Sequence, residues 1–245
     1  MNTPTVHSGP TGVPVQAPAD NGAPVQRGVF SAPELAFIVG VPAAWGILLL
    51  FHPIGGDSFY ENIDGNVTAW ITVHLGMGIF VPLFAGVVYL LLRDVESTAA
   101  TVSRIGLAVF AVLYAAWELV LGVGTGILTD ETSALPEAQQ AVGADLVESY
   151  GENGVIVVLS VVGSLGLAVG MIGAVVALRG AYRLGPVPLV LMLLALPLIA
   201  IHEPPFGPVG LALFIVAALL YVRQRASAPA RSAPPLDELV PAPPA

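Results

Sequence analysis

Four ionisable side chains lie inside long apolar runs of the sequence or at the ends of such runs. They are His52, His74, Glu118 and His202. Ionisable groups are costly inside a membrane and tend to face a bundle interior or a watery cavity, so each is a candidate for function. Imidazole nitrogens suit zinc, copper and iron, and a carboxylate completes such a ligand set. These residue types predict a metal site formed by His52, His74, Glu118 and His202.

His74 and Glu118 are expected at similar depth on consecutive antiparallel helices. At about 1.5 Å per residue, His74 lies about 10 Å from the outer end of its run, and Glu118 lies about 15 Å from the outer end of the next. His52 and His202 end two further runs on the same side, so that all four side chains could converge. Three aromatic residues are spaced to share a helix face with His52, His74 or Glu118, namely Trp45, Trp70 and Tyr114, and Trp117 adjoins Glu118.

The same residues allow other functions. Two histidines that face each other across a helix bundle could ligate a haem, which makes His52, His74 and His202 candidate cofactor ligands. Alternatively, His74 and Glu118 form a proton relay in a transporter or channel for a small solute or proton. A third hypothesis is an accessory membrane subunit without a site of its own. Whether the protein is an enzyme is left open by the sequence.

Each residue also has a purely structural interpretation. His74 could donate one hydrogen bond to a neighbouring helix, and Glu118 could be a neutral carboxylic acid bonded to a hydroxyl or a backbone carbonyl. His52 and His202 lie at expected membrane interfaces, where a polar histidine side chain costs little free energy. None of these three histidines lies at the opposite, arginine-rich end, and this shared side favours a common site.

The composition indicates an integral membrane protein. Of 245 residues, 56% are hydrophobic and only 10% are charged, against about 25% charged in an average soluble domain. The absence of cysteine excludes disulfides, thiolate metal sites and iron–sulfur clusters. All eight basic residues are arginine, which excludes Schiff-base chemistry on lysine. The arginines are few and flank the apolar runs, so nucleic-acid binding is not expected.

Six apolar segments predict an all-α, polytopic protein with six transmembrane helices in a bundle. The predicted transmembrane domain covers residues 32–223, between disordered tails at 1–31 and 224–245 that are rich in proline and alanine. The fifth and sixth segments are short and could form either two spans or one re-entrant hairpin. Two spans are favoured because arginines precede and follow the pair. The segments are Pro33–Ile54, Val67–Leu92, Ile105–Leu128, Val155–Leu178, Pro186–His202 and Pro208–Val222.

The arginines predict the orientation of the chain. All eight fall in the two tails or in the second and fourth loops, whereas the first, third and fifth loops carry only acidic charge. Arginine is retained on the cytoplasmic side, which places both termini inside and an acidic surface outside. The expected location is the cytoplasmic membrane of a bacterium. The expected partners are the lipid bilayer and a homo-oligomer or larger membrane complex.

Two smaller patterns predict local structure. The third loop, Thr129–Asn153, contains Pro136 and Glu137 followed by helix-forming residues, which predicts a short helix outside the membrane. Small residues in the fourth segment, Gly166 and Gly170 among them, are four apart. This spacing lets helix backbones approach closely, so tight packing of this segment is expected.

A His-Pro pair at His52 ends one segment, the next carries Trp70 and His74 as Trp-x-x-x-His, and a short arginine-bounded loop follows. In this pattern, which covers mainly 52–128, the chain resembles uncharacterised small multi-pass membrane proteins of GC-rich actinobacteria. The resemblance implies a membrane location and no particular activity.

Overall fold

The computed structural model describes residues 30–182 and 184–227, and every regular element in these ranges is helical. The predicted all-α fold is confirmed for this part of the chain. The predicted tails lie outside the described residues, except for 30–31 and 224–227. The elements are α1 (Ala32–Leu49), α2 (Phe59–Ile63), α3 (Val67–Leu91), α4 (Thr98–Val109), η1 (Phe110–Tyr114), α5 (Ala115–Trp117), η2 (Glu118–Val123), α6 (Gly124–Ser133), α7 (Glu137–Gly151), α8 (Gly154–Tyr182), α9 (Pro186–Ile201) and α10 (Phe206–Ser227).

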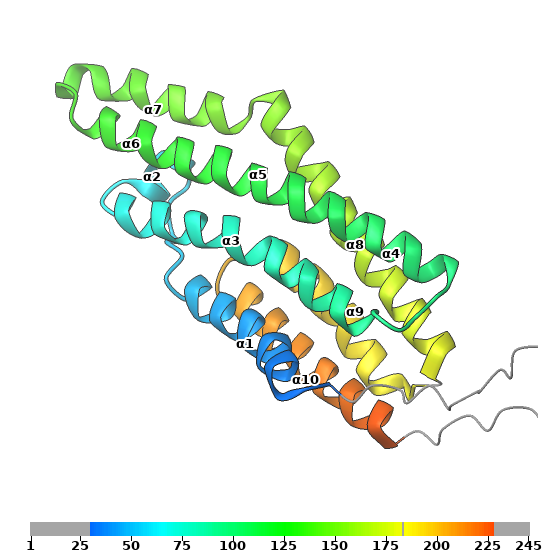
Figure 1. Cartoon of the computed structure of the whole chain (residues 1–245). Helices are drawn as coiled ribbons and strands as arrows, with labels where there is room; N and C mark the ends of the chain where they lie inside the picture. Colours follow the sequence, from blue (N-terminus) through cyan, green and yellow to red (C-terminus); the bar gives the residue numbers. More distant parts are fainter. Residues whose placement is uncertain (1–29, 183, 228–245) are drawn as a thin grey trace, which may run out of the picture. The chain divides into compact units, whose positions relative to one another are not determined.

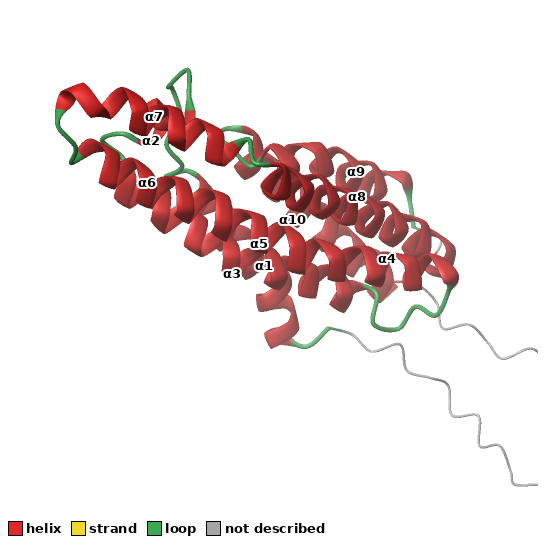
Figure 2. Ribbon diagram, turned by 90° about the horizontal axis from the view of Figure 1, so that it is seen from above, coloured by secondary structure: helices red, strands yellow, loops and turns green. Residues whose placement is uncertain are grey.

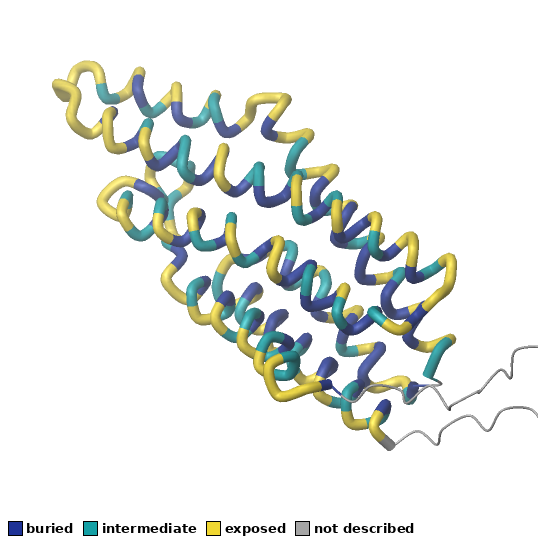
Figure 3. Tube along the Cα trace, viewed as in Figure 1, coloured by how far each residue is buried: buried dark blue, intermediate teal, exposed yellow. Residues whose placement is uncertain are grey.

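Within the described residues, five helices are long and apolar enough to cross a membrane. They are α1, α3, α8, α10 and the continuous helix Thr98–Ser133, which runs from α4 through α6 and contains the π-helical segments η1 and η2 (Figure 1). Helix α9 is apolar but has only 16 residues. Large aliphatic residues such as Ile79, Val158 and Leu165 are exposed. Exposed positions recur along the outer sides of the long helices (Figure 3). A helix that is apolar on its inner and outer faces suits lipid rather than water.

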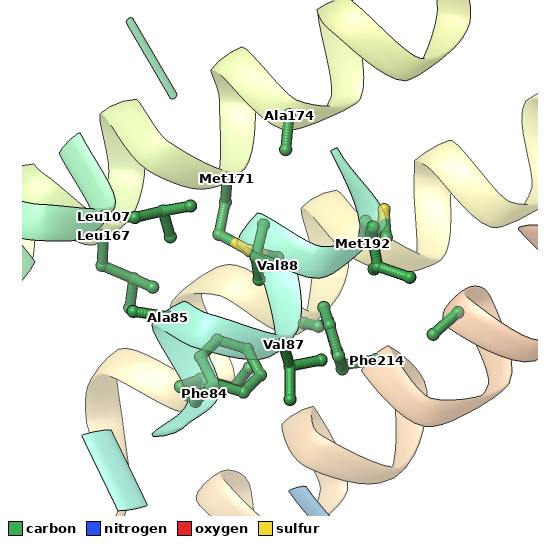
Figure 4. Close-up of a cluster of buried hydrophobic side chains, with 14 of the residues drawn as sticks. Phe84, Ala85, Val87, Val88, Leu107, Leu167, Met171, Ala174, Met192 and Phe214 are labelled. Carbon is green, nitrogen blue, oxygen red and sulfur yellow. The ribbon is translucent and has the colours of Figure 1, made fainter. Parts of the chain in front are cut away.

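The inner faces of the long helices meet in a close-packed apolar core. Helix α3 lies at its centre and contributes side chains on two sides (Figure 4). Around it lie α4, α8, α9 and α10, so the core joins the second predicted span to four other elements. The labelled core residues are Phe84, Ala85, Val87, Val88, Leu107, Leu167, Met171, Ala174, Met192 and Phe214.

Glycines bring α8 against α4 and η1, as the small-residue spacing predicted. A Cβ added to Gly166 would lie 2.7 Å from the backbone nitrogen of Phe110, and one added to Gly106 would lie 2.6 Å from that of Gly170. Contacts this short leave no room for a side chain. The Ser103 hydroxyl uses the proximity to donate a 2.6 Å hydrogen bond to the Gly170 carbonyl.

Ion pairs fasten one end of the bundle. Arg93, just after α3, pairs with Glu34 in the first turn of α1, and Asp94 beside it pairs with Arg225 near the end of α10. At the same end, the backbone N–H of Gly185 donates a 3.1 Å hydrogen bond to the Gln224 side chain, so α9 begins beside the end of α10.

The opposite end carries α2 and a hairpin of α6 and α7, which gather together in Figure 2. The helix predicted in the third loop is present as α7. Two features differ from the prediction. Helix α6 continues the third segment as far as Ser133, and α2 forms in the first loop. The N–H of Tyr60 donates to the Glu148 carboxylate at 2.9 Å, and the Ser133 hydroxyl donates to Asp64 at 2.9 Å. These bonds hold α2 against the hairpin.

Candidate functional site

Three histidines come together from three separate parts of the chain. His52 follows α1, His74 lies in the second turn of α3, and His202 follows α9. All three are buried, and one potential ligand atom of each lies within 4.8 Å of those of the other two. The sequence predicted this convergence, and the structure brings all three predicted histidines to one place.

His74 is fixed by its own helix and by a gap in the neighbouring one. Its Nδ1 atom lies 2.8 Å from the Trp70 carbonyl, and its ring centroid lies 4.3 Å from that of Trp70. On its other side, a Cβ added to Gly122 would collide with the imidazole. Only glycine at this position leaves room for the His74 ring between α3 and η2.

His52 contributes a fully buried ring nitrogen that lacks a hydrogen-bond partner among the described residues. Its Nδ1 atom lies 2.8 Å from the Pro53 carbonyl, and the nitrogen without a partner is Nε2. Its ring lies 5.2 Å from that of His74 and 5.4 Å from that of His202. A buried nitrogen without a partner is costly, and its position among two other imidazoles points to a shared ligand.

His202 is held at a tight turn. Its φ of +46° lies in the left-handed region, which is uncommon outside glycine, and it ends α9 abruptly. Its Nδ1 atom lies 3.3 Å from the Tyr114 hydroxyl, which lies 3.4 Å from the Ala200 carbonyl. The Trp117 ring packs against the imidazole with a centroid distance of 5.9 Å.

These partners assign the proton on two of the rings. His52 and His74 each have Nδ1 beside a backbone carbonyl, which can only accept, so their Nδ1–H groups donate. Their Nε2 atoms then carry a lone pair, the form in which imidazole binds metals. Hydrogen bonds of this kind fix the tautomer and orientation of metal-ligating histidines.

The spacing is slightly larger than that of a bound ion. Nitrogen ligands in a tetrahedral zinc site, with bonds of about 2.0–2.1 Å, are about 3.3 Å apart. From separations of up to 4.8 Å, the rings would close on an ion by at most about 1.5 Å. Small rotations about the side-chain torsions are enough for such a movement.

Glu118 lies beside this triad rather than within it. Its Oε2 atom is 3.8 Å from Nε2 of His74, and neither carboxylate oxygen has a hydrogen-bond partner among the described residues. The side chain is 1% exposed. Glu118 is therefore placed to complete the coordination of an ion held by the triad or to balance its charge.

The third predicted span supplies its site residues from an irregular stretch. Tyr114 ends η1 and Glu118 begins η2, so the two π segments flank the short α5. A π turn adds a residue to the helical repeat and is frequent at functional sites. The sequence had indicated that Tyr114 and Glu118 share a face, but the contact of Tyr114 with His202 was not expected.

Trp45 packs in the apolar core, and Glu203 is an exposed neighbour of the triad. The ring of Trp45 packs on that of Phe84, at a centroid distance of 5.6 Å, instead of following the face of His52. The reason is that α1 ends at Leu49, so helical periodicity does not extend to His52. Glu203, next to His202, is exposed.

No protein-family model, curated protein or solved structure matches the chain. The resemblance to actinobacterial membrane proteins therefore stays a prediction.

Proposed function

We propose that this is an integral membrane protein that binds a transition-metal ion through His52, His74 and His202, with Glu118 beside them. The observation that carries the proposal is the convergence of three buried imidazoles, one with an unpartnered Nε2 atom. Imidazole is a good ligand for zinc, copper and iron, and a nearby carboxylate favours a divalent ion over a soft monovalent one.

The ring spacing favours an ion over a haem. Two histidines on opposite faces of a haem have ring centroids about 6.3 Å apart, because each ring centre lies about 1.1 Å beyond a nitrogen that is about 2.0 Å from the in-plane iron. In a tetrahedral ion site the corresponding distance is about 5.1 Å. The ring of His52 is 5.2 and 5.4 Å from the rings of His74 and His202, which is closer to the ion geometry. Trp70 also packs against His52, at 5.1 Å.

The proposed topology has six crossings, with both termini in the cytoplasm and the ion site toward the outside. Helix α9 supports the sixth crossing. It begins beside the end of α10, and His202, which directly follows it, joins His52 and His74 at the other end of the bundle. The eight arginines of the sequence support the orientation. The proposed location is the bacterial cytoplasmic membrane.

Purified protein tests the proposed function directly. Elemental analysis should find about one zinc, copper or iron per chain, removable by a chelator, and Co²⁺ should restore occupancy with the visible absorption of a tetrahedral site. His52→Ala should lose this absorption while still purifying as a folded protein. A wild-type protein that takes up neither Zn²⁺ nor Co²⁺ contradicts the proposal.

A proton relay is the second candidate, and the close pair of His74 and Glu118 is the observation that favours it. Buried histidines and carboxylates that neighbour each other form proton pathways in membrane transporters. Proton uptake by reconstituted vesicles would test this function. Uptake that is lost on Glu118→Gln but insensitive to metal chelation would favour the relay over the ion site.

A further inference from the structure

Trp70 packs against two of the three histidines. Its ring packs against His74 at 4.3 Å and against His52 at 5.1 Å. Its carbonyl lies 2.8 Å from Nδ1 of His74. Because the ring and the carbonyl act on the same imidazole, His74 has both its plane and its tautomer set by one residue, which lies one helical turn earlier.

The indole N–H of Trp70 acts on the neighbouring helix. It donates a 2.7 Å hydrogen bond to the Gly122 carbonyl and lies 3.2 Å from the Thr125 hydroxyl oxygen. Gly122 belongs to η2, the π segment that begins with Glu118. A buried hydrogen bond between two helices fixes their relative position, so this bond sets how far Glu118 stands from His74.

Gly122 explains why the arrangement depends on this bond. A Cβ on Gly122 would overlap the His74 ring, so α3 and η2 approach closely at this level. The same glycine that admits the imidazole offers its carbonyl to Trp70. Gly122 therefore takes part in two contacts, one with the His74 ring and one with the Trp70 indole. If the indole hydrogen bond is lost, η2 can move away from His74.

We propose that Trp70 is the positioning residue of the ion site, an inference that rests on the proposed metal binding. Its ring and carbonyl hold the His74 imidazole in place, with Nδ1 at the Trp70 carbonyl and Nε2 left to bind the ion. Its N–H holds η2, and with it Glu118, at the distance from which the carboxylate reaches the ion.

Trp70→Phe tests this role, because phenylalanine keeps an aromatic ring and the backbone carbonyl but lacks the N–H. The measurement is titration of metal-free protein with Co²⁺, followed by visible absorption. The carbonyl that His74 bonds is retained, so the expected change comes from η2 moving and carrying Glu118 with it. The Trp70→Phe protein should bind Co²⁺ about tenfold more weakly, with altered absorption bands.

Trp45→Phe is the matched control. Trp45 is also fully buried, but its ring packs on Phe84 and its Nε1 atom has no hydrogen-bond partner among the described residues. This variant should keep the wild-type dissociation constant and spectrum. A Trp70→Phe protein that matches the control in both overturns the positioning role and leaves the ion site standing. A wild-type protein that binds no Co²⁺ removes the site and the role together.

A second measurement keeps Trp70 in place and covers the case in which Trp70→Phe does not fold. In a protein carrying Trp45→Phe and Trp117→Phe, Trp70 is the only tryptophan. Cu²⁺ quenches indole emission at short range, so one equivalent should remove most of the fluorescence. Emission that stays unchanged while the ion binds contradicts contact between Trp70 and the ligands.

Discussion

The Nε2 atom of His74 lies 3.8 Å from the Oε2 atom of Glu118, with both side chains almost completely buried and on different helices. The sequence predicted this proximity from the similar depth of the two residues on consecutive antiparallel helices. Polar groups buried without partners are costly, and removing one member of such a pair leaves the other exposed to the full desolvation penalty. The presence of this pair is therefore better explained by ligand binding or proton transfer than by a contribution to the free energy of folding.

Glu118→Gln should weaken Co²⁺ binding at least about tenfold, because it removes the charge beside the triad while keeping the shape of the side chain. His74→Ala should lose binding more completely, since it removes a ligand. The double variant should bind no worse than the weaker single variant, because both act on one site. Membrane insertion and yield should match wild type for Glu118→Gln, and unchanged Co²⁺ affinity in that variant would separate Glu118 from the site.

Gly122→Ala should abolish or strongly reduce ion binding, because the new Cβ would occupy the space of the His74 ring. Co²⁺ titration and thermal unfolding in detergent measure the effect. Gly40→Ala in α1 is the control, since a Cβ there meets nothing within 4 Å. In a helix, alanine is favoured over glycine by up to about 1 kcal/mol, so the control should be neutral or stabilised. Equal behaviour of the two variants would contradict the packing argument.

The helices were predictable because their signal is collective. Each long apolar run needs only length and composition to be identified, and α1, α3, α8 and α10 begin within a few residues of their predicted starts. Gly166 and Gly170 were correctly expected to lie at a close helix contact, since their spacing is a local property of one helix. The convergence of the three histidines was predictable because all three lie toward the same end of the bundle.

The details of the site depend on contacts that no local pattern encodes. The π segments η1 and η2 have ordinary apolar sequences, so nothing indicated that the turn would widen at Tyr114 and Glu118. The role of Gly122 becomes visible only when α3 lies against it. Trp45 was misplaced because the sequence does not mark the end of α1 before His52.

Asp94→Asn should lower stability near neutral pH and have little effect in acid. Burial raises the pKa of Asp94, but the hydrogen bonds and charges of Arg225 and Arg93 outweigh it and hold that pKa below its usual value of 3.8. Because the folded pKa is the lower one, the stabilisation is complete above pH 3.8 and disappears as the pH falls through the folded pKa. Asp94 is 45% exposed, which limits the effect to about 1 kcal/mol.

Thermal unfolding in detergent measures this effect as a decrease of about 2–4 °C at pH 7 that vanishes below the folded pKa. Glu96→Gln, a change of the neighbouring exposed carboxylate, is the control and should leave the midpoint unchanged at both pH values. A loss of stability for Asp94→Asn that is the same in acid as at neutral pH would show that the ion pair with Arg225 is not its cause.

The absence of cysteine from the chain allows the topology to be mapped with single substitutions. In intact cells, a membrane-impermeant maleimide should label Asp57→Cys and Glu203→Cys but not Glu96→Cys or Ala226→Cys. The prediction follows from the proposed orientation, in which acidic loops face outward and arginine-flanked segments face the cytoplasm. All four positions are exposed, so the reagent can reach each from one side of the membrane.

Glu203 is the decisive position, because it follows His202 directly in the turn between α9 and α10. Labelling there from outside, with Ala226→Cys labelled only after the membrane is opened, requires α9 and α10 to be two full crossings. Labelling of Glu203→Cys only from the cytoplasmic side would instead make α9 and α10 a re-entrant hairpin. Because His202 adjoins Glu203 and its ligand atoms lie within 4.8 Å of those of His52 and His74, that result would also overturn the outward-facing position of the ion site.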